Sequence, residues 1–594
     1  MANLSKIKRD NMINFLENLK KQHSDDASIR AFNEIENHLR EKKYGLVWEE
    51  HSEQVDEMLE ENIPVLVADK ERRLCKDEKL PWNFIIEGDN LQALYLLQKT
   101  HKGKIDCIYI DPPYNTGNTN WKYNNNYVNQ DDLYRHSKWL SMMYTRLHIA
   151  KEILSDNGVL ICAIDENEYA HLCCILEEIF PSYEIHSISI IHNQKGVVGK
   201  NFAYTHEYAI FVIPSGQKVI GDKKLREDEI YVSNLRNWGI ESLRSDAKNC
   251  FYPIIVKNDK IVAFGDVSPN DYHPKANEAN PDGTISVYPV DIQGIERKWR
   301  YARQSVEGIK DILEVKKGRD GTVQIMIAKK YGTYKTVWTD KRYDAGEFGT
   351  KLLKKFLPHC DFDFPKSIWN VYDCLYAVVG NNKDAIILDF FAGSGTTGHA
   401  VNLLNSQDGG TRKFIMATNN EISAEEEKKF KSEGITPDDE KWQNKGIAKS
   451  VTWPRIVSCI EGRDSDGKRL SDKYLDMDIS YGDGFKSNVK YFKCEWTPRK
   501  PEDYLLSNAL CLHIKEMIEL QNAIEVDNIK NVLILNKDDF MKTVLNKEVY
   551  KKIEHIWVNQ NIVFNADELK LLQTKGFKYI PREFFGQEMK DAGE

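Results

Sequence analysis

The chain carries, at residues 105–114, the stretch IDCIYIDPPY: an apolar run closed by an acid, two prolines and a tyrosine. The run is rich in β-branched and aromatic residues, which predicts a short buried strand of a parallel sheet. Two successive prolines donate no ladder hydrogen bonds, so this strand should end in a stiff turn. Ligands bind at the carboxyl ends of the strands in an open α/β sheet. The catalytic candidates in this turn are therefore Asp111, Pro112, Pro113 and Tyr114. The alternative is an ordinary turn at the end of a strand, with no catalytic role.

The segments around this stretch alternate between strand and helix patterns, which implies a parallel sheet built from βαβ units. A polar loop at 115–130 is either a lid that grips a substrate or a disordered connection. Two apolar segments farther on are close enough to form an antiparallel hairpin at the sheet edge. The expected elements are a strand at 83–86, a helix from 91 to 100, a helix at 132–154, a strand at 159–164, a helix at 166–180 and hairpin strands at 185–191 and 207–213.

Composition places the chain among ordinary globular proteins. It has 594 residues, of which 41% are hydrophobic and 29% charged, and no apolar run approaches the roughly 18 residues that a membrane span requires. The first residues lack the apolar core of a signal peptide, so we expect a cytoplasmic protein. The eleven cysteines include no C-x-x-C pair. We therefore expect reduced thiols and no structural metal.

One segment is strongly basic although the whole chain has a formal charge of −9. Between residues 297 and 342, thirteen Lys or Arg stand against five Asp or Glu, and five aromatic residues, Trp299 and Trp338 among them, are interleaved. Such a mixture is typical of a nucleic-acid surface, although a solvated charged face is the alternative. The DNA-binding candidates are Arg297, Lys298, Arg300, Arg303, Lys316, Lys317, Arg319, Lys329 and Lys330.

A second motif, AIILDFFAGSGTTGHA at 385–400, reads as a buried strand, a glycine-rich turn and a helix that begins near Thr396. Glycines let a ligand approach the backbone, and a helix N-terminus offers free N–H groups. The glycines match G-x-G-x-x-G, so a nicotinamide or flavin site has to be considered, as does a turn that only packs helix on strand. A P-loop is excluded, because His399 and Ala400 stand where Lys and Ser or Thr are needed. Glu421, after the next strand, suits a ribose diol in several cofactors.

The two motifs together resemble the amino-group DNA methyltransferases in their β-type order, in which the catalytic half of the sheet precedes the cofactor half. More narrowly, the chain resembles the modification subunit of type III restriction-modification systems. The matching blocks are KKYGLVWEEHSE, EGDNLQAL, IDPPYNTG, SDNGVLICAIDENE, FGTKLLKKF and FDFPKS. The chain departs from that family at two places: Phe390, where the family usually has proline, and the sequence TNNE at 418–421, which differs from the usual one.

The resemblance implies a Rossmann-like α/β methyltransferase sheet that carries a target recognition insert. It also implies methyl transfer from S-adenosylmethionine to N6 of a flipped adenine in double-stranded DNA. The Asp111 carboxylate and the Pro112 carbonyl would accept hydrogen bonds from the target amine, with Tyr114 stacked on the base. By the same resemblance, the cofactor residues are Asp89, Lys366, Ser367, Asp389, Phe391, Ala392, Gly393, Ser394, Gly395, Thr396, Thr397 and Glu421.

The implied partners are DNA, a second copy of the chain in a homodimer and a separate restriction subunit. N4-cytosine methylation, a DNA-recognition subunit with a lapsed site and a nicotinamide-dependent oxidoreductase remain as alternatives. The expected organisation is an N-terminal helical extension at 1–80, a catalytic half at 81–213, a recognition insert at 214–348, a cofactor half at 349–425 and a C-terminal assembly region at 426–594. Two amphipathic patterns in the extension, at 7–20 and 27–40, predict helices that act as a docking arm or cover a sheet.

Overall fold

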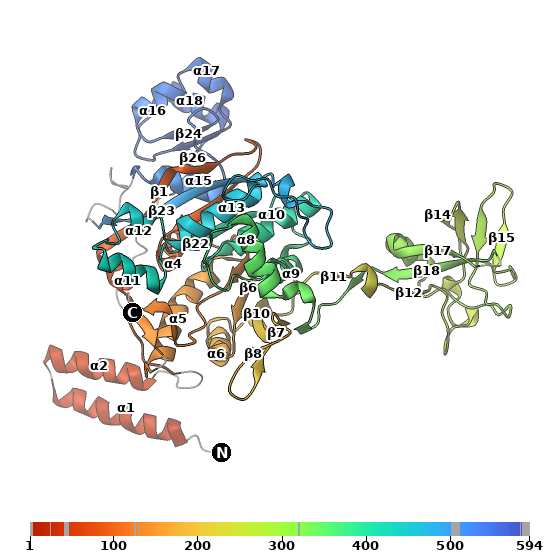
Figure 1. Ribbon diagram of the computed structural model, residues 1–594, viewed down its shortest axis with the longest axis horizontal. Helices are drawn as coiled ribbons and strands as arrows, with labels where there is room; N and C mark the ends of the chain where they lie inside the picture. The colour runs from red at the N-terminus through yellow and green to blue at the C-terminus, as the bar shows by residue number, and fades with distance from the viewer. Residues whose placement is uncertain are drawn as a thin grey trace. The chain divides into compact units, whose positions relative to one another are not determined.

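The computed structural model describes residues 4–23, 25–40, 47–123, 126–129, 131–318, 321–499, 511–581 and 584. The chain forms two compact units (Figure 1). Unit 1 comprises residues 1–219 and 336–594, and unit 2 comprises residues 220–335. Unit 2 is therefore shorter in sequence than the insert predicted at 214–348.

Unit 1 is built on a ten-stranded sheet. The strand order is β1 (Asn62–Leu74), β23 (Asn488–Pro498), β2 (Trp82–Glu87), β22 (Lys413–Thr418), β21 (Ile386–Asp389), β3 (Ile105–Ile110), β6 (Leu154–Ile164), β10 (His206–Pro214), β7 (Tyr183–Ile191) and β20 (Val337–Trp338). Neighbours from β23 to β6 are all parallel, whereas β10 is antiparallel to both β6 and β7. The expected α/β sheet is confirmed.

Helices cover both faces of this sheet, which explains why its central strands are continuously apolar. Ile108 and Ile110 of β3 pack in one core with one helix layer, whereas Cys107 and Tyr109 face the other layer. All four are at most 2% exposed. The first layer contains α4 (Asn90–His101), α5 (Arg135–Ile153), α6 (Tyr169–Ile179) and α15 (Ile514–Asn522). The second contains α9 (Ile368–Val379), α10 (Thr396–Asp408) and α13 (Trp453–Glu461).

The predicted antiparallel hairpin exists but lies inside the sheet. Strands β7 and β10 pair over their full length, and β10 lies between β6 and β7. The short strand β20 then covers β7, with the Ser189 N–H donating to the Thr336 carbonyl at 2.8 Å. Trp338 of β20 is only 6% exposed and packs against Phe211. Its assignment to the DNA-binding aromatic residues is therefore wrong.

Both ends of unit 1 contribute strands to the main sheet, which the expected organisation did not assign to them. β1 lies in the segment that was expected as a helical extension, and it pairs antiparallel with β23. β23 in turn pairs with β2, so a strand from the predicted assembly region lies within the sheet. These pairings join segments far apart in the chain, which a local residue pattern does not report. The predicted boundaries near residues 80 and 426 therefore do not coincide with edges of the sheet.

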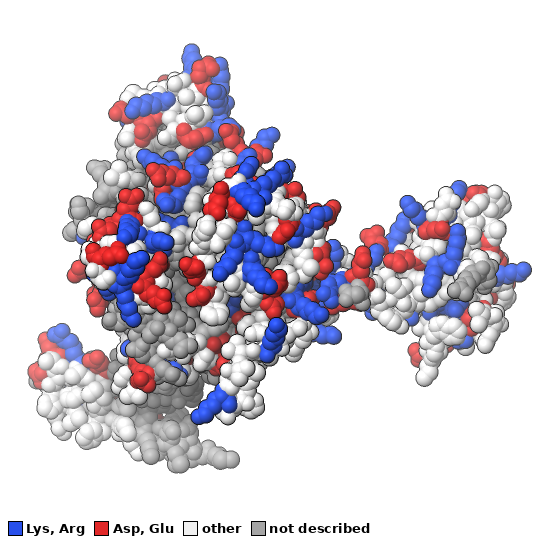
Figure 2. Space-filling model, viewed as in Figure 1, with Lys and Arg blue, Asp and Glu red and all other residues white. Residues whose placement is uncertain are grey.

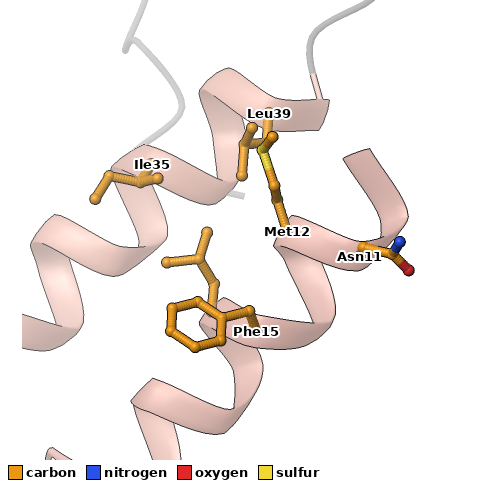
Figure 3. Close-up of a pocket in the computed structure, with 6 residues that line it drawn as sticks. Asn11, Met12, Phe15, Ile35 and Leu39 are labelled. Carbon is orange, nitrogen blue, oxygen red and sulfur yellow. The ribbon is translucent and has the colours of Figure 1, made fainter. Parts of the chain in front are cut away.

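Two predicted helices form a hairpin near the N-terminus, α1 (Leu4–Gln22) and α2 (Asp26–Arg40). Ile13 and Leu16 are buried between them, whereas Met12 and Phe15 are 51% and 65% exposed. A pocket between the helices is lined mainly by apolar side chains (Figure 3). Over the described residues, no helix combines the length and apolarity needed to span a bilayer.

Further elements complete unit 1, among them a small parallel sheet with its own apolar core. That sheet consists of β24 (Asn531–Ile534), β25 (His555–Val558) and β26 (Lys578–Tyr579), with α16 (Lys537–Thr543), α17 (Lys547–Lys552) and α18 (Ala566–Lys575). The others are α3 (Gln54–Glu61), β4 (Asn118–Tyr123), β5 (Asn126–Asn129), β8 (Val197–Val198), β9 (Ala203–Tyr204), α8 (Leu352–Phe356), α11 (Ala424–Ser432) and α12 (Glu440–Gln443). The polar loop at 115–130 thus contains the hairpin β4–β5.

Unit 2 holds two antiparallel sheets around a separate apolar core that includes Leu235, Ile254, Trp299 and Ile325. One sheet has the order β12 (Tyr231–Asn234), β18 (Val323–Lys329), β17 (Leu313–Lys317). The other has the order β14 (Lys260–Phe264), β13 (Ile254–Lys257), β16 (Ile285–Val287), β15 (Asn277–Ala279). The two ends of unit 2 pair with each other through β11 (Lys223–Lys224) and β19 (Tyr331–Gly332).

Candidate active site

The two sequence motifs meet at one edge of the unit 1 sheet. Strand β3 ends immediately before Asp111, and the neighbouring parallel strand β21 ends at Asp389. Because parallel strands end at the same edge, the DPPY turn and the glycine turn lie next to each other. Their separation in the sequence is therefore bridged by the pairing of β21 with β3.

Helix α5 holds the DPPY turn in place. The indole N–H of Trp139, which is fully buried, donates to the Pro113 carbonyl at 2.7 Å. Asn115 follows the turn with a φ of 55°, a left-handed conformation that asparagine tolerates better than most residues. Its side-chain amide donates to the Arg135 carbonyl at 3.2 Å and to the carboxylate of Glu168. The turn is thus fixed from both of its flanks.

A buried ionic cluster surrounds the Asp111 carboxylate. The Lys366 ammonium lies 3.3 Å from Asp111 Oδ1 and 2.5 Å from Glu207 Oε2, and it also contacts the Tyr114 hydroxyl. Glu207 accepts a second hydrogen bond from the Asn370 amide at 2.7 Å. Lys366 thus lies beside the Asp111 carboxylate, although we predicted it as a cofactor residue. Glu207 and Asn370 were not predicted, because only the pairing of distant elements brings them here.

Burial governs the protonation of these groups. It raises the pKa of Asp111, and the adjacent Lys366 ammonium opposes that rise. Burial alone would also raise the pKa of Glu207, but Lys366 lowers it below the usual value. Burial would lower the pKa of Lys366, yet Asp111 and Glu207 raise it above the usual value. The lysine is therefore charged between its two carboxylates at neutral pH.

The carboxylate of Asp389, at the start of the glycine turn, stabilises that turn. Asp389 accepts from the Phe391 N–H at 3.0 Å and from the Thr397 hydroxyl at 2.5 Å. Burial raises the pKa of Asp389 to about 7, against the two hydrogen bonds that lower it. Gly393 and Gly395 adopt φ values of 48° and 78°, so a side chain there would strain the backbone. These conformations shape the turn from which α10 starts.

A buried arginine that we did not predict supports this turn from behind. Arg455 on α13 donates from Nη1 to the Ser394 hydroxyl at 2.8 Å and to the Thr396 hydroxyl at 2.7 Å. It is fully buried, and burial lowers its pKa to about 10. The hydroxyls of Thr396 and Thr397, which we expected at a cofactor carboxylate, are thus engaged within the turn. An arginine on the apolar face of a helix was the available sequence signal for this role.

The remaining cofactor candidates lie at or near the same edge. Asp89 follows β2, caps α4 by accepting from the Leu91 N–H at 2.8 Å, and lies 3.2 Å from Arg146 Nη2. Its side chain is 43% exposed. Glu421 follows β22 and is exposed. Ser367 is buried, with its hydroxyl donating to the Arg342 carbonyl at 2.7 Å and capping α9, so that hydroxyl serves the fold.

Three possible metal ligands gather beside the DPPY turn, although we predicted no metal. His136, Glu168 and His171 bring their ligand atoms within 4.8 Å of one another. The buried Glu168 carboxylate already accepts from His136 Nδ1 at 2.7 Å, from His171 Nδ1 at 2.8 Å and from Asn115. The cluster thus acts as a hydrogen-bonded support for the turn.

The predicted basic surface of unit 2 divides into structural and exposed residues. Arg297 pairs with Asp291 at 2.9 Å, and Arg303 donates to the Gly265 carbonyl at 2.6 Å, so both stabilise the fold. Trp299, which was counted among the aromatic residues of the basic segment, belongs to the core of unit 2 and is not part of its surface. Arg300, Lys316, Lys317 and Lys329 are exposed, Lys298 and Lys330 are half-buried, and Arg319 lies outside the described residues.

Charge on unit 2 is also less concentrated than the sequence count indicated. Lys317 pairs with Asp259 at 2.6 Å, and Lys330 lies 4.0 Å from Glu314. On the face drawn in Figure 2, basic and acidic groups are interspersed over the described surface. An exposed feature that we missed is Trp238, 53% exposed, with the guanidinium groups of Arg236 and Arg297 each 5.1 Å from its ring centre.

Comparison with known proteins matches these two motifs to one family. The chain is 33% identical over 358 residues to the type II methyltransferase M.KpnI of Klebsiella pneumoniae, an alignment that covers 56% of this chain and 79% of that protein. It is 29% identical over 414 residues to the type III restriction-modification enzyme EcoPI Mod subunit of Escherichia phage P1. The StyLTI Mod subunit of Salmonella typhimurium is 29% identical over 386 residues.

These alignments cover 61% and 60% of this chain, but only 62% and 56% of the two Mod subunits. The family model described as DNA methylase, N6_N4_Mtase, matches residues 105–434 and so includes both turns and unit 2. The expected resemblance is thereby confirmed. Because the match spans more than half of its residues, the chain belongs to the N6_N4_Mtase family of DNA methylases.

Proposed function

We propose that this chain transfers a methyl group from S-adenosylmethionine to N6 of an adenine that is flipped out of double-stranded DNA. The observation that carries the proposal is the position of Asp111 and the glycine turn at the ends of adjacent strands, β3 and β21. A methyl donor on the glycine turn and an amine at Asp111 would then be neighbours. The similarity to a type II methyltransferase and to the Mod subunit of a type III restriction-modification enzyme supports methyl transfer to DNA.

The residues of the glycine turn fit such a donor. Left-handed Gly393 and Gly395 allow close approach to the backbone, and Phe391 offers a half-buried ring. The exposed carboxylates of Asp89 and Glu421 suit an amine or a ribose diol. When bound, S-adenosylmethionine supplies an activated methyl group.

The DPPY turn would prepare the amine for attack. An aryl amine delocalises its lone pair into the ring. Hydrogen bonds from its two N–H groups to the Asp111 carboxylate and the Pro112 carbonyl localise that pair on nitrogen. Tyr114 would stack on the flipped base and offset part of the cost of unstacking. These interactions strengthen as positive charge develops on nitrogen, so they favour the transition state.

The test is methyl transfer from labelled S-adenosylmethionine to DNA, with nucleoside analysis of the product. Asp111→Ala should lower kcat by at least about 100-fold while DNA binding persists, because the charged acceptor of the amine is lost. N6-methyladenine in the product supports the proposal. N4-methylcytosine would instead establish the cytosine activity, and unchanged methylation by Asp111→Ala would overturn the catalytic assignment.

We further propose that the chain acts as a modification subunit beside a separate restriction subunit, and that it forms a homodimer. The similarity to type III Mod subunits supports the first assignment. The exposed apolar side chains of Met12, Phe15 and Ile35 on the α1–α2 hairpin support the second, because exposed apolar side chains on one hairpin favour association. Sedimentation equilibrium of the wild type and of Phe15→Glu should show a dimer and a monomer, respectively. A monomeric wild type would exclude the homodimer.

A further inference from the structure

Glu207 and Lys366 lie outside the DPPY turn, but their side chains contact it. Lys366 contacts Asp111 and Tyr114, and Glu207 contacts Tyr114. Glu207 stands near the start of β10 and is 5% exposed, and the Lys366 side chain is 11% exposed just before α9. Because β10 runs antiparallel to β6, its first residues lie beside the carboxyl end of β6, with Tyr208 opposite Ile164. Strand β10 thus brings Glu207 to the sheet edge that carries the DPPY and glycine turns, here called the active edge.

The contacts place one ammonium between two carboxylates. Lys366 Nζ lies 2.5 Å from Glu207 Oε2 and 3.3 Å from Asp111 Oδ1. The Tyr114 hydroxyl donates to Glu207 Oε2 at 3.2 Å, and Asn370 holds the other oxygen of Glu207 at 2.7 Å. Glu207 is therefore anchored on both oxygens, and Lys366 is closer to Glu207 than to Asp111.

This arrangement answers a physical problem of the proposed reaction. A carboxylate that is partly removed from water, as the half-buried Asp111 is, tends to take up a proton when it has no counter-ion. A protonated Asp111 would accept hydrogen bonds from an amine poorly. Lys366 supplies the counter-ion. An ammonium held only by Asp111 would, however, compete with the substrate amine for the same oxygens. A second carboxylate gives the ammonium another partner once the amine arrives.

We propose that Glu207 and Lys366 are positioning residues for methyl transfer: Lys366 keeps Asp111 ionised in the free site, and Glu207 retains Lys366 when the target amine displaces it. This inference rests on the proposed function, because it assumes that an amine binds Asp111.

The electrostatics of the site agree with this geometry. Burial raises the pKa of Asp111, Lys366 lowers it, and Glu207 raises it further. Loss of Lys366 should therefore raise the pKa of Asp111, and loss of the Glu207 charge should lower it. The other titratable groups that face Asp111, Glu207 or Lys366 are unchanged in both variants: Tyr109, Tyr114, Asp165, His192, Cys374 and Asp389.

The test is the pH dependence of kcat/KM for DNA at saturating S-adenosylmethionine, which reports ionisations of the DNA-free enzyme. Activity should fall at acid pH as Asp111 takes up its proton. In Lys366→Met that acid limb should move to higher pH, by about one unit or more. In Glu207→Gln it should move to lower pH, and the KM for DNA should rise several-fold because Lys366 then competes for Asp111. Opposite shifts are the expected signature.

The matched control is Glu519→Gln. Glu519 is 1% exposed and lies 2.8 Å from the buried Lys490, so this variant also removes one acid from a buried ion pair. It should leave the acid limb in place. Thermal unfolding gives a readout independent of turnover: Lys366→Met should unfold earlier than the double variant Glu207→Gln/Lys366→Met, in which no unpaired carboxylate remains at Glu207.

If Lys366→Met does not fold, Glu207→Gln and the double variant carry the test, with the acid limb of the double variant above that of Glu207→Gln. Variants that lower kcat while the acid limb keeps its wild-type position would overturn the inference and leave the proposed function standing. A wild-type enzyme that transfers no methyl group to DNA would overturn both.

Discussion

The half-buried Asp111 and the buried Asp389 show how two carboxylates at neighbouring strand ends acquire different properties. Asp111 lies 3.3 Å from a lysine ammonium, whereas Asp389 accepts hydrogen bonds from a hydroxyl and a backbone N–H. Burial raises the pKa of Asp389 to about 7, so this group is partly protonated at neutral pH. Asp111 is thus suited to accept hydrogen bonds from a substrate, and Asp389 to hold the glycine turn.

The raised pKa of Asp389 makes folding depend on pH. Between its ordinary pKa of 3.8 and about 7, the folded chain keeps a proton that the unfolded chain releases, so stability falls as pH rises through this window. For one such group the loss from pH 5 to pH 8 is roughly 2–3 kcal/mol. Asp389→Asn should remove that part of the loss, which urea unfolding at both pH values measures.

The exposed Asp384 provides a control for this measurement, because its side chain is 75% exposed. Asp384→Asn should keep the wild-type difference in unfolding free energy between pH 5 and pH 8. If Asp389→Asn shows the same difference as the wild type, Asp389 is ionised in the folded protein throughout this range.

At the scale of elements, α5 acts as a support for the catalytic turn. Its Trp139 indole is the donor to the Pro113 carbonyl, and Trp139→Phe removes that N–H together with part of the buried ring volume. The carbonyl then lacks a buried partner, which should cost about 1–3 kcal/mol of stability. The looser turn should lower kcat about tenfold, since misplaced hydrogen-bond acceptors lose transition-state stabilisation. Single-turnover methylation measures this effect.

The matched control is Trp299→Phe, which removes an equivalent indole N–H from the Tyr252 carbonyl in the core of unit 2. It should destabilise the protein but leave the single-turnover rate at saturating DNA unchanged. A normal rate in Trp139→Phe would show that the prolines alone hold the turn.

The exposed basic residues of unit 2 provide a test of DNA contact at the same scale. Arg300, Lys316 and Lys329 are exposed, so they are free to neutralise phosphates. If each contacts one phosphate, their joint change to alanine should reduce the slope of log affinity against log salt by about 2.7. Arg303→Ala removes charge too, but it should lower the unfolding temperature and leave the slope nearly unchanged, because Arg303 binds backbone carbonyls. Equal slopes in the triple variant and the wild type would move the DNA surface elsewhere.

Local pattern was sufficient to predict the elements that build the active edge. The strand β3, its proline stop and the glycine turn each depend on adjacent residues, and the structure has them at the predicted positions. Glu207, Lys366 and Arg455 act through contacts between distant elements, so no local pattern identified their roles. The short strand β20 and the long strand β1 were missed or truncated for the same reason, since their pairing partners lie far away in the chain.

At the scale of the whole molecule, the order of the motifs follows from how the sheet is assembled. Strand β3, which carries the DPPY turn, precedes β21 by more than 270 residues in the chain, yet β21, which carries the glycine turn, lies beside it in the sheet. Unit 2 is inserted between β10 and β20. The first and last strands of unit 2 pair with each other, with Lys223 opposite Gly332. An insertion with paired ends can be added without disturbing the sheet, because both crossing points lie close together.

This organisation predicts that unit 2 is dispensable for the fold of unit 1. Joining residue 219 to residue 336 through a short glycine-serine linker should leave a protein that unfolds cooperatively, because the unit 2 core shares no residue with the core of the sheet. The shortened chain should bind S-adenosylmethionine with the wild-type Kd, measured by calorimetry, and should lose sequence-specific DNA binding. The isolated segment 220–335 should itself show a cooperative thermal transition. Failure of the shortened chain to bind the cofactor, with the isolated segment folded, would mean that unit 2 stabilises the active edge as well as contacting DNA.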